Sequence, residues 1–255
     1  MEILNKNFNL MTEQLKAQQE KLIINERHEA WESLARKLAH EIKNPLTPIQ
    51  LTIDKLNSKY SDEIENKKKE DFTKSLDIIR KQIKQIENLV NEFSDFARMP
   101  KPILKNNNLV LIIKDNINLL KTLDDSIFLN FNYFDHDVFF NSDSEQLSRV
   151  IFNLIKNSIE SIAEKKQNIV KFVGKIEIEL VDKDTYIGFM IKDNGVGFGI
   201  FKDRIKDILN PYYTTKKMGT GLGLAIVNKI INDHQGILDF KDLKDGAQIN
   251  IKFNK

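Results

Sequence analysis

Apolar residues recur at steps of three and four along residues 26–59, a pattern that predicts an α-helix with one apolar face. Because successive residues are rotated by about 100° around such a helix, His40 falls almost opposite the apolar face. Asn44 lies one turn further along, beside His40, and Glu41 is the next side chain. The pattern therefore predicts an imidazole that faces solvent, close to a carboxylate and an amide. The apolar positions are Trp31, Leu34, Ala35, Leu38, Ile42, Leu46, Ile49, Ile53 and Leu56.

A second apolar pattern runs from Phe72 to Ala97 at steps of four and three, and it ends at the helix breaker Met99-Pro100-Lys101-Pro102. Residues 58–69, between the two patterns, are rich in Ser, Asp, Asn and Lys, which predicts a loop with Lys67–Lys69 at a solvated tip. Two long helices joined by a short loop form an antiparallel hairpin. Since a lone hairpin cannot bury both apolar faces well, we predict a homodimer in which two hairpins form a four-helix bundle.

Residues 1–25 are polar, with sparse apolar residues close to heptad spacing. This spacing allows a short parallel coiled coil, and we expect a helical linker rather than a ligand sensor. Neither Gly nor Pro separates this segment from the His40 helix, so a twist or shift would pass along a continuous rod.

After Pro102 the pattern changes to short alternating segments between shorter helices. Helices are predicted over 109–120, 144–163 and 220–233. Strands are predicted over 127–134, 138–140, 175–181, 186–191, 236–240 and 247–253. Strands interrupted by helices, with neighbouring hairpins, predict a mixed sheet covered by helices on one face. The predicted domains are 1–25, 26–102 and 103–255, and the fold class is α plus α/β, a helical hairpin followed by an α/β domain.

Composition excludes several kinds of function. The net charge of +2 indicates neither a nucleic-acid partner nor a membrane surface. The absence of cysteine excludes disulfides, thiolate metal sites and a cysteine nucleophile. No apolar run reaches the roughly 18 residues of a membrane span, and the N-terminus does not resemble a signal peptide. We therefore expect a soluble chain as given, or the cytosolic part of a longer membrane protein.

His40 by itself has two interpretations, a solvated polar residue on an amphipathic helix or a reactive group. A zinc site is excluded, because the helical His-Glu-x-x-His signature needs a second histidine where this chain has Asn44. The choice between the two interpretations depends on motifs in the second half of the chain.

The first of these motifs is Asn153 and Asn157, one turn apart on the predicted helix 144–163 and outside its apolar stripe. Asparagine is a modest helix former, so two at this spacing suggest a polar task. An amide oxygen is a suitable ligand for Mg²⁺. The alternative is a pair of solvated amides.

The second motif, Asp193-Asn194-Gly195-Val196-Gly197, directly follows an apolar strand. A buried carboxylate at a strand end can accept a hydrogen bond from an exocyclic amine, and the glycines permit close approach of the backbone. The alternative is an ordinary Asp-Asn-Gly turn.

The third motif, Gly219-Thr220-Gly221-Leu222-Gly223, opens a predicted helix. Backbone N–H groups at a helix N-terminus attract phosphate. The motif is not a Walker loop, because it lacks the Gly-Lys-Ser/Thr ending. The preceding residues, 210–217, contain proline, tyrosines and lysines, which predicts a mobile lid whose lysines reach phosphates.

Each motif is weak alone, but the three in this order are specific as a set. Together with Leu38–Leu46 they resemble the sensor histidine kinases of two-component systems, and the likeness covers nearly the whole chain. The matching segments are Leu38–Leu46 for the H-box, Asn153 and Asn157 for the N-box, Asp193, Gly195 and Gly197 for the G1 box, Pro211–Lys216 for the F-box, Gly219–Gly223 for the G2 box and Gly246-Ala247 for the final glycine motif.

Within that family, three segments resemble the nitrogen-regulation NtrY-like group: Glu29-Ala30-Trp31, Thr47–Leu51 and Tyr212–Lys216. Residues 4–22 resemble the tail of a HAMP signalling helix. Members of the group are usually membrane-anchored. The resemblance thus implies a cytoplasmic chain, the cytosolic part of an inner-membrane sensor, with membrane attachment only in a longer form that carries transmembrane helices.

The resemblance also implies a GHKL-type ATP-binding sandwich and a set of roles. His40 is expected to accept the phosphoryl group of ATP, Glu41 to orient the ring and take its proton, and Asn44 to position water for phosphatase activity. Asn157 with Asn153 is expected to hold Mg²⁺. The phosphoryl group would pass to a response-regulator receiver domain of the NtrX-like group, with no nucleic acid involved. The expected nucleotide-binding residues are Asn153, Asn157, Asp193, Gly195, Gly197, Thr215, Lys216, Gly219, Thr220, Gly221, Leu222 and Gly223.

Two alternatives of other classes stay open at this point. One is a degenerate kinase that acts only as a dimeric scaffold, against which the intact nucleotide motifs argue. The other is a GHKL ATPase that releases phosphate to water without a phosphohistidine, against which the exposed histidine argues.

Overall fold

The computed structural model describes residues 35–60, 66–121, 127–134, 136–169, 171–199, 205–214, 216 and 219–255. The chain divides into two compact units, Met1–Met99 and Pro100–Lys255, and each is considered by itself. The domain limits predicted at residues 25 and 102 stay predictions, and the segment 1–25 lies outside the described residues. No helix among the described residues is both long and apolar enough to cross a bilayer.

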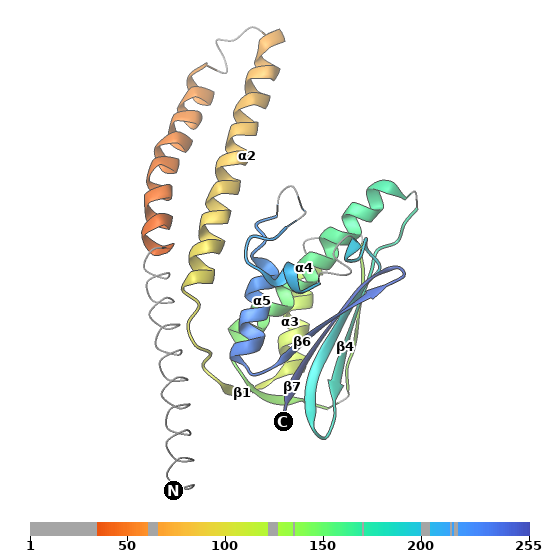
Figure 1. Cartoon of the computed structure of the whole chain (residues 1–255). Coiled ribbons are helices and arrows are strands. Elements are labelled where there is room, and N and C mark those ends of the chain that lie inside the picture. Colours follow the sequence, from red (N-terminus) through yellow and green to blue (C-terminus); the bar gives the residue numbers. More distant parts are fainter. Residues whose placement is uncertain are drawn as a thin grey trace, which may run out of the picture. The chain divides into compact units, whose positions relative to one another are not determined.

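The first unit contains two long helices, one described over 35–60 and α2 over Asn66–Ala97, which run side by side (Figure 1). Arg80 of α2 reaches the first helix, where Nη2 and Nε donate to Asp54 Oδ1 at 2.7 and 3.1 Å. The amphipathic patterns therefore form the predicted hairpin. Its core consists of Leu46, Ile53, Leu76 and Ile83, with Phe72 packed against them.

The loop predicted over 58–69 is too long. The first helix continues through residue 60, and α2 begins at Asn66, so Lys67–Lys69 lie in the first turn of a helix and not at a loop tip. The physical reason is that Lys and Glu, which dominate the start of α2, are good helix formers even where no apolar periodicity marks them.

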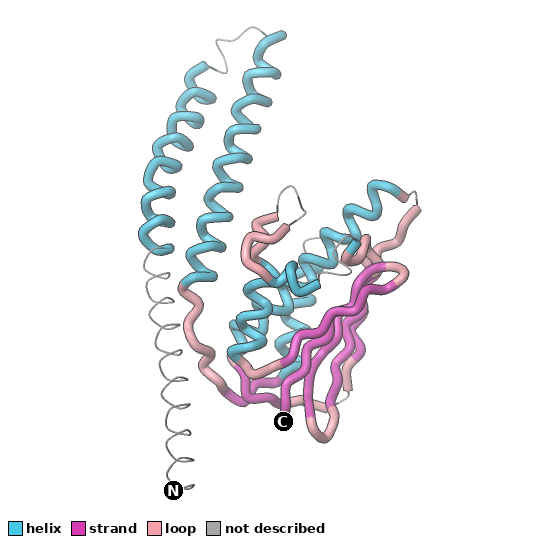
Figure 2. The backbone as a smooth tube through the Cα atoms, in the orientation of Figure 1, coloured by secondary structure: helices cyan, strands magenta, loops and turns pink. Residues whose placement is uncertain are grey.

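The second unit is a mixed sheet with helices on one face (Figures 1 and 2). The five-stranded sheet has the order β2-β4-β5-β7-β6; β2 and β4 are parallel and the other pairs are antiparallel. Its strands are β2 (Phe128–Asn132), β4 (Lys175–Asp182), β5 (Tyr186–Asp193), β6 (Ile237–Leu243) and β7 (Gly246–Asn254). A separate antiparallel pair joins β1 (Lys105–Asn108) to β3 (Phe139–Ser142).

Three helices cover the sheet: α3 (Leu109–Lys121), α4 (Ser144–Asn168) and α5 (Gly223–Asp233), with a short 3₁₀ helix, η2, over Ile205–Leu209. The Asp143 carboxylate caps α4 by accepting from the backbone N–H groups of Glu145 and Gln146, both at 3.1 Å. The predicted fold class is thus confirmed, and each predicted helix and strand of this unit is present with limits that differ by a few residues. β1, a Lys-Asn-Asn-Asn segment, was not predicted.

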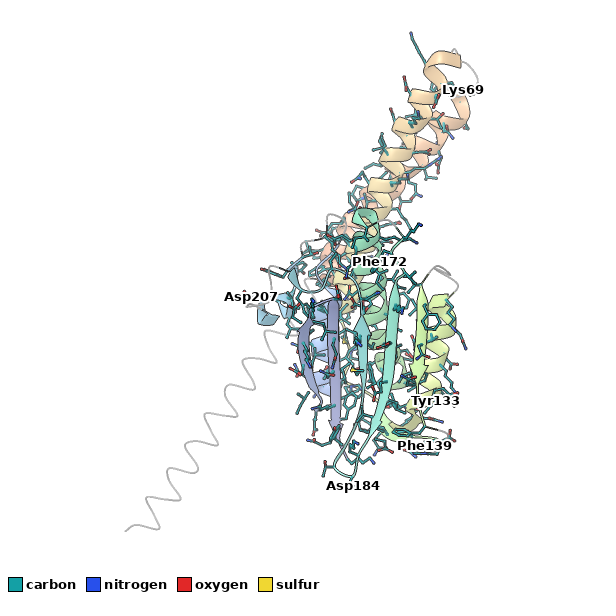
Figure 3. The ribbon with its side chains drawn as sticks, turned by 90° about the vertical axis from the view of Figure 1, so that its right-hand side faces the viewer. Lys69, Tyr133, Phe139, Phe172, Asp184 and Asp207 are labelled. Atoms are coloured by element: carbon teal, nitrogen blue, oxygen red, sulfur yellow. The ribbon has the colours of Figure 1, made fainter. Side chains whose placement is uncertain are left out.

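The two ends of the sheet differ in chemistry. Figure 3 shows Asp184 at the β4–β5 turn and Phe172 at the opposite end of the same strands. Asp193 ends β5 at the Phe172 end, where it pairs with Ile176, the second residue of β4. The inward side chains of β4 and β5, such as Ile178 and Phe189, are buried, and α4 packs against both strands. This packing fixes the strand end that carries Asp193.

Candidate functional site

His40 lies on the first helix and is exposed, as are Glu41 and Asn44. The ring therefore faces solvent, as the helical pattern predicts. The Glu41 carboxylate lies 3.9 Å from Lys37 Nζ, with 58% of the Glu41 side chain exposed. Within the described residues no hydrogen bond joins Glu41 to the His40 ring.

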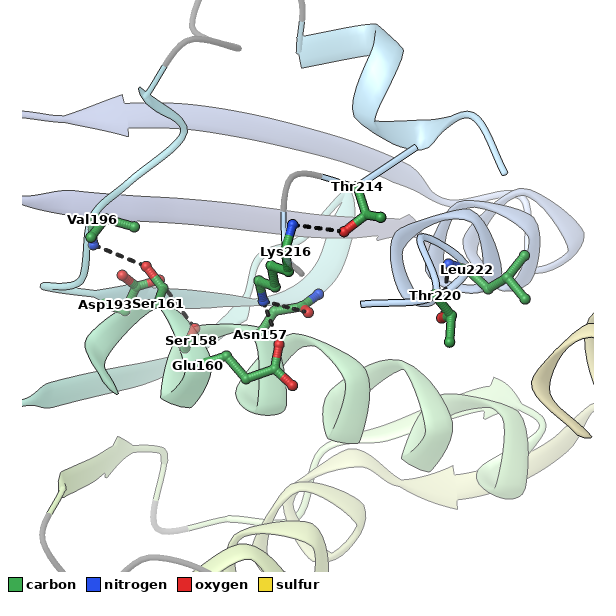
Figure 4. A network of polar contacts seen from close by, with 10 residues as sticks. All are labelled: Asn157, Ser158, Glu160, Ser161, Asp193, Val196, Thr214, Lys216, Thr220 and Leu222. Carbon is green, nitrogen blue, oxygen red and sulfur yellow. Dashed lines mark hydrogen bonds and ion pairs between the residues drawn. The ribbon is translucent and has the colours of Figure 1, made fainter. Parts of the chain in front are cut away.

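Asp193, at the end of β5, is 7% exposed and its carboxylate is held from several sides (Figure 4). Oδ1 accepts from the Gly195 N–H at 2.9 Å, and Oδ2 accepts from Ser158 Oγ at 3.1 Å. The backbone N–H of Ala247 also donates to it. Burial raises the pKa of Asp193, and these donors together with the positive charge of Lys165 oppose that rise. The carboxylate is thus a buried acceptor.

The turn after Asp193 is fixed against α4 and the start of β7. Val196 N–H donates to Ser161 Oγ of α4 at 3.0 Å. Gly246 has φ +102°, and a Cβ there would lie 1.9 Å from the Asp193 carbonyl oxygen. Only glycine allows this close approach of two backbones. Gly197, also in the left-handed region at φ +71°, lies against Gly246.

Asn153 and Asn157 of α4 face the start of α5. A Cβ built on Gly223 would lie 3.2 Å from Asn153 Oδ1 and 4.0 Å from Asn157 Nδ2. Asn153 Nδ2 donates to the Arg149 carbonyl at 2.8 Å, which orients the amide. The structure therefore brings the predicted N-box and G2-box residues together.

The segment Gly219–Gly223 is a turn before α5, and the helix predicted from residue 220 begins instead at Gly223. The reason is Gly221, whose φ of +70° is incompatible with a right-handed helix. A Cβ on Gly221 would lie 2.5 Å from the Tyr212 carbonyl carbon, and Tyr212 N–H donates to the Gly221 carbonyl at 3.1 Å. Leu222 N–H donates to Thr220 Oγ1 at 3.3 Å.

Lys216 reaches α4 from the segment before this turn. Its Nζ donates to the carboxylate of Glu160 and, at 3.5 Å, to Asn157 Oδ1 (Figure 4). Thr215, the other predicted nucleotide residue of this segment, lies outside the described residues, as does part of the predicted lid.

The oxygen atoms of Asn157 and Glu160 are suitable ligands for a divalent cation that binds together with a nucleotide. Asn157 Oδ1 and the Glu160 carboxylate already contact a cation, the Lys216 ammonium. The described residues contain no cluster of three or more His, Cys, Asp or Glu side chains. Mg²⁺ is compatible with that, because it usually takes one or two protein ligands and completes its shell with phosphate oxygens and water.

Three residues that support this site were missed in the sequence. Ser158 and Glu160 lie next to Asn157 on α4, and Lys165 Nζ donates to the Asn194 carbonyl at 2.8 Å. The available signal was position: Glu160 follows Asn157 by three residues, which places both on one helix face.

The arrangement offers the three functions that a nucleotide requires. A buried carboxylate can accept from an exocyclic amine, N–H groups before α5 can bind phosphate, and Asn157 can hold a metal. His40, in the other unit, offers an exposed nucleophile.

Comparison with known proteins agrees with this division. Residues 30–102 match the family model for the "His Kinase A (phospho-acceptor) domain", and residues 142–255 match that for the "Histidine kinase-, DNA gyrase B-, and HSP90-like ATPase". The chain is 40% identical over 248 residues to a putative sensor histidine kinase NtrY-like of Rickettsia felis, covering 97% of this chain and 40% of that protein. It is 36% identical over 231 residues to the nitrogen regulation protein NtrY of Azorhizobium caulinodans, covering 88% of this chain and 28% of that protein.

Solved structures give the same fold. The catalytic domain of the histidine kinase ThkA has a TM-score of 0.52 and 26% identity, and the match covers 60% of this chain and 95% of that domain. Full-length ShkA in complex with AMPPNP has a TM-score of 0.64 and covers 87% of this chain and 45% of that chain, at 18% identity. The chain spans about two fifths of the length of the NtrY-like relatives from Rickettsia.

Proposed function

We propose a reaction for this chain, which belongs to the sensor histidine kinases of two-component systems: it transfers the γ-phosphoryl group of ATP to His40, and then to an aspartate of a response regulator. The observation that carries the proposal is the exposed imidazole of His40 on the phosphoacceptor hairpin of a chain whose other unit carries the buried carboxylate of Asp193.

In the second unit, the Asp193 carboxylate accepts a hydrogen bond from the exocyclic amine of adenine. Hydrogen bonds donated by Ser158 and Gly195 keep that carboxylate oriented. Asn157, with Asn153, holds Mg²⁺. Backbone N–H groups of the Gly219–Gly223 turn and the Lys216 ammonium bind phosphate oxygens. Of these N–H groups, that of Gly219 already donates to the Lys216 carbonyl and that of Leu222 to Thr220 Oγ1. When bound, magnesium and ATP supply the phosphoryl group and the charge neutralisation; the chain supplies position.

In the first unit, His40 acts as the nucleophile, because its ring is exposed and carries a nitrogen lone pair. Glu41 releases Lys37, orients the ring and accepts its proton. Asn44, one turn away, positions water when the chain acts as a phosphatase toward its regulator. We propose a receiver domain as the partner, of the NtrX-like group.

Homodimerisation is supported by apolar side chains that a single hairpin leaves uncovered. They recur at steps of seven or of four, so each helix presents one apolar stripe. A second copy of the hairpin covers them in a four-helix bundle. The uncovered side chains, each 38–45% exposed, are Leu38, Ile42, Ile49, Leu56, Ile79 and Ile86.

We also propose that this chain is the cytosolic part of an inner-membrane sensor, since the NtrY-like relatives from Rickettsia extend well beyond the matched region.

The test is phosphorylation of the purified chain with labelled ATP and magnesium. Label that is lost in acid and retained in base indicates phosphate on nitrogen. His40→Gln abolishes this label and leaves nucleotide binding unchanged. Nucleotide binding without any label would support a scaffold, and steady phosphate release from His40→Gln at the wild-type rate would support an ATPase.

A further inference from the structure

The Lys216 ammonium occupies a cation position on α4. It contacts the Glu160 carboxylate and lies 3.5 Å from Asn157 Oδ1 (Figure 4). The Lys216 and Glu160 side chains are 35% and 40% exposed, so the contact is partly shielded from solvent. The oxygen proposed to bind the metal therefore already has a cationic partner supplied by the chain itself.

The backbone on either side holds Lys216 in place. Its N–H donates to Thr214 Oγ1 at 3.1 Å, and its carbonyl accepts from the Gly219 N–H at 3.1 Å. Gly219 opens the turn whose N–H groups are proposed to bind phosphate. The position of Lys216 is thus coupled to that of the turn.

A metal ion bound to Asn157 Oδ1 would lie near this ammonium in the arrangement observed. Mg²⁺ binds oxygen at about 2.1 Å, which would place it close to the Lys216 Nζ that now lies 3.5 Å from the same oxygen. Two cations so close repel strongly, because little water separates them. This repulsion favours departure of the ammonium from Asn157 when the metal binds.

We propose that Glu160 is a positioning residue that holds Lys216 in the cation position beside Asn157 in the nucleotide-free chain, so that magnesium and nucleotide bind as Lys216 exchanges Glu160 for phosphate oxygens. This inference rests on the proposed nucleotide site and adds a competition between the chain's own cation and the metal.

The exchange has a consequence for metal-free nucleotide. Without a metal, the negative charge of Glu160 repels the nucleotide phosphates, while Lys216 is paired with Glu160 and not with those phosphates. Removing the Glu160 charge releases Lys216 to the phosphates. The gain requires Lys216, which separates it from a general reduction in negative charge.

The first experiment measures the acylation rate of Lys216 in the nucleotide-free chain by mass spectrometry, with the well-exposed Lys37 as internal reference. Glu160→Gln is expected to raise the Lys216 rate about threefold, as expected for loss of a partly exposed ion pair. Glu164→Gln, the same charge change one turn along α4, is the matched control and leaves the rate unchanged. Equal Lys216 rates in Glu160→Gln and wild type would overturn the proposal.

The second experiment measures AMPPNP binding by calorimetry, with EDTA and with magnesium. Glu160→Gln is expected to tighten binding in EDTA about fivefold in the wild-type background. In the Lys216→Gln background the same change has a smaller effect. Equal effects in both backgrounds, or no binding of AMPPNP under either condition, would overturn the exchange.

Neither readout requires phosphoryl transfer. A chain that shows the Lys216-dependent responses and never phosphorylates His40 would contradict the proposed kinase activity and leave the exchange supported. A chain that phosphorylates His40 without those responses would contradict the exchange alone.

Discussion

Ser158 Oγ of α4 donates a hydrogen bond of 3.1 Å to Oδ2 of Asp193, a carboxylate that is buried at the end of β5. This contact joins the helix that carries Asn153 and Asn157 to the strand that carries the proposed adenine acceptor. It also stabilises the charged form of a group whose burial favours the neutral form. The hydroxyl of Ser158 is therefore expected to tune both the orientation and the ionisation of Asp193.

Ser158→Ala removes this donor and leaves a buried carboxylate oxygen with one partner fewer. We expect nucleotide affinity to fall about tenfold, since a hydrogen bond to a charged group contributes about 1.5–3 kcal/mol. Calorimetric titration with AMPPNP and magnesium measures the change. Ser158→Thr keeps the hydroxyl and serves as the control, and an affinity in Ser158→Ala equal to that of wild type would show that the contact is dispensable.

The pH dependence of binding follows from the same carboxyl group. Burial raises the pKa of Asp193 above 3.8, so the folded chain binds this proton more tightly than the unfolded chain does. As pH falls through the raised pKa, protonation of Asp193 favours the folded state, whereas nucleotide binding declines because the charged acceptor is lost. In Ser158→Ala the decline begins at higher pH, because the lost donor had favoured the charged form.

Binding curves for AMPPNP measured across the acidic range show whether affinity falls as Asp193 is protonated. Urea unfolding at the same pH values shows whether this protonation stabilises the folded state. Asp193→Asn removes the contribution of this carboxyl group to both dependences. A wild-type affinity that does not change while Asp193 titrates would contradict the assigned role.

Gly246→Ala places a methyl group against the Asp193 carbonyl oxygen, at a position where φ is +102°. We expect the free energy of unfolding of the second unit to fall by about 2 kcal/mol or more, because strain and a backbone clash add. Gly199 has φ +52° and nothing within 4 Å of a built Cβ, so Gly199→Ala tests strain alone. Urea unfolding that gives equal losses for the two variants would contradict the close approach at Gly246.

Ile49→Asp introduces a charge into the apolar stripe that we propose is covered by a second hairpin. Ile49 is 45% exposed in the single chain, so the substitution should leave the hairpin folded and shift the dimer toward monomer. Light scattering over a concentration series reports the change in mass. Ile78, which is 60% exposed and lies off the stripe, provides the control Ile78→Asp. Dimerisation of Ile49→Asp as tight as that of Ile78→Asp would exclude this surface.

Glu41→Gln keeps the shape of the side chain but removes its ability to accept a proton. We expect the rate of His40 phosphorylation to fall about 10²-fold, the lower end of general-base contributions, with nucleotide affinity unchanged. Rapid-quench measurements of labelled chain give the rate. Phosphorylation of Glu41→Gln at the wild-type rate would assign the proton transfer elsewhere.

The sequence predicts the helices and strands in which apolar residues recur at a regular spacing. The hairpin helices and α4 are amphipathic over many turns, and β4 and β5 alternate, so burial decides their structure locally. β1 was missed because Lys-Asn-Asn-Asn has no apolar alternation, and it becomes a strand only through pairing with β3. The predicted start of α5 at residue 220 was wrong, because the spacing of apolar residues does not reveal that Gly221 has a left-handed backbone conformation.

The site could be predicted only in part, for a related reason. Asp193 and the glycines stand out by residue type and spacing, whereas Glu160 looks like any solvated residue on a helix. Its role depends on Lys216, which is distant in sequence and approaches only in the fold. The three-residue spacing from Asn157 indicates a shared helix face, but it does not identify Lys216 as the partner of Glu160.

The most direct test of the account is to locate the phosphate on the wild-type chain after incubation with magnesium and ATP. ³¹P nuclear magnetic resonance of the intact protein, with mass spectrometry of its peptides under neutral conditions, identifies the modified atom and residue. The account predicts one phosphoryl group on an imidazole nitrogen of His40. Phosphate found only in solution, or on any residue other than His40, would contradict it.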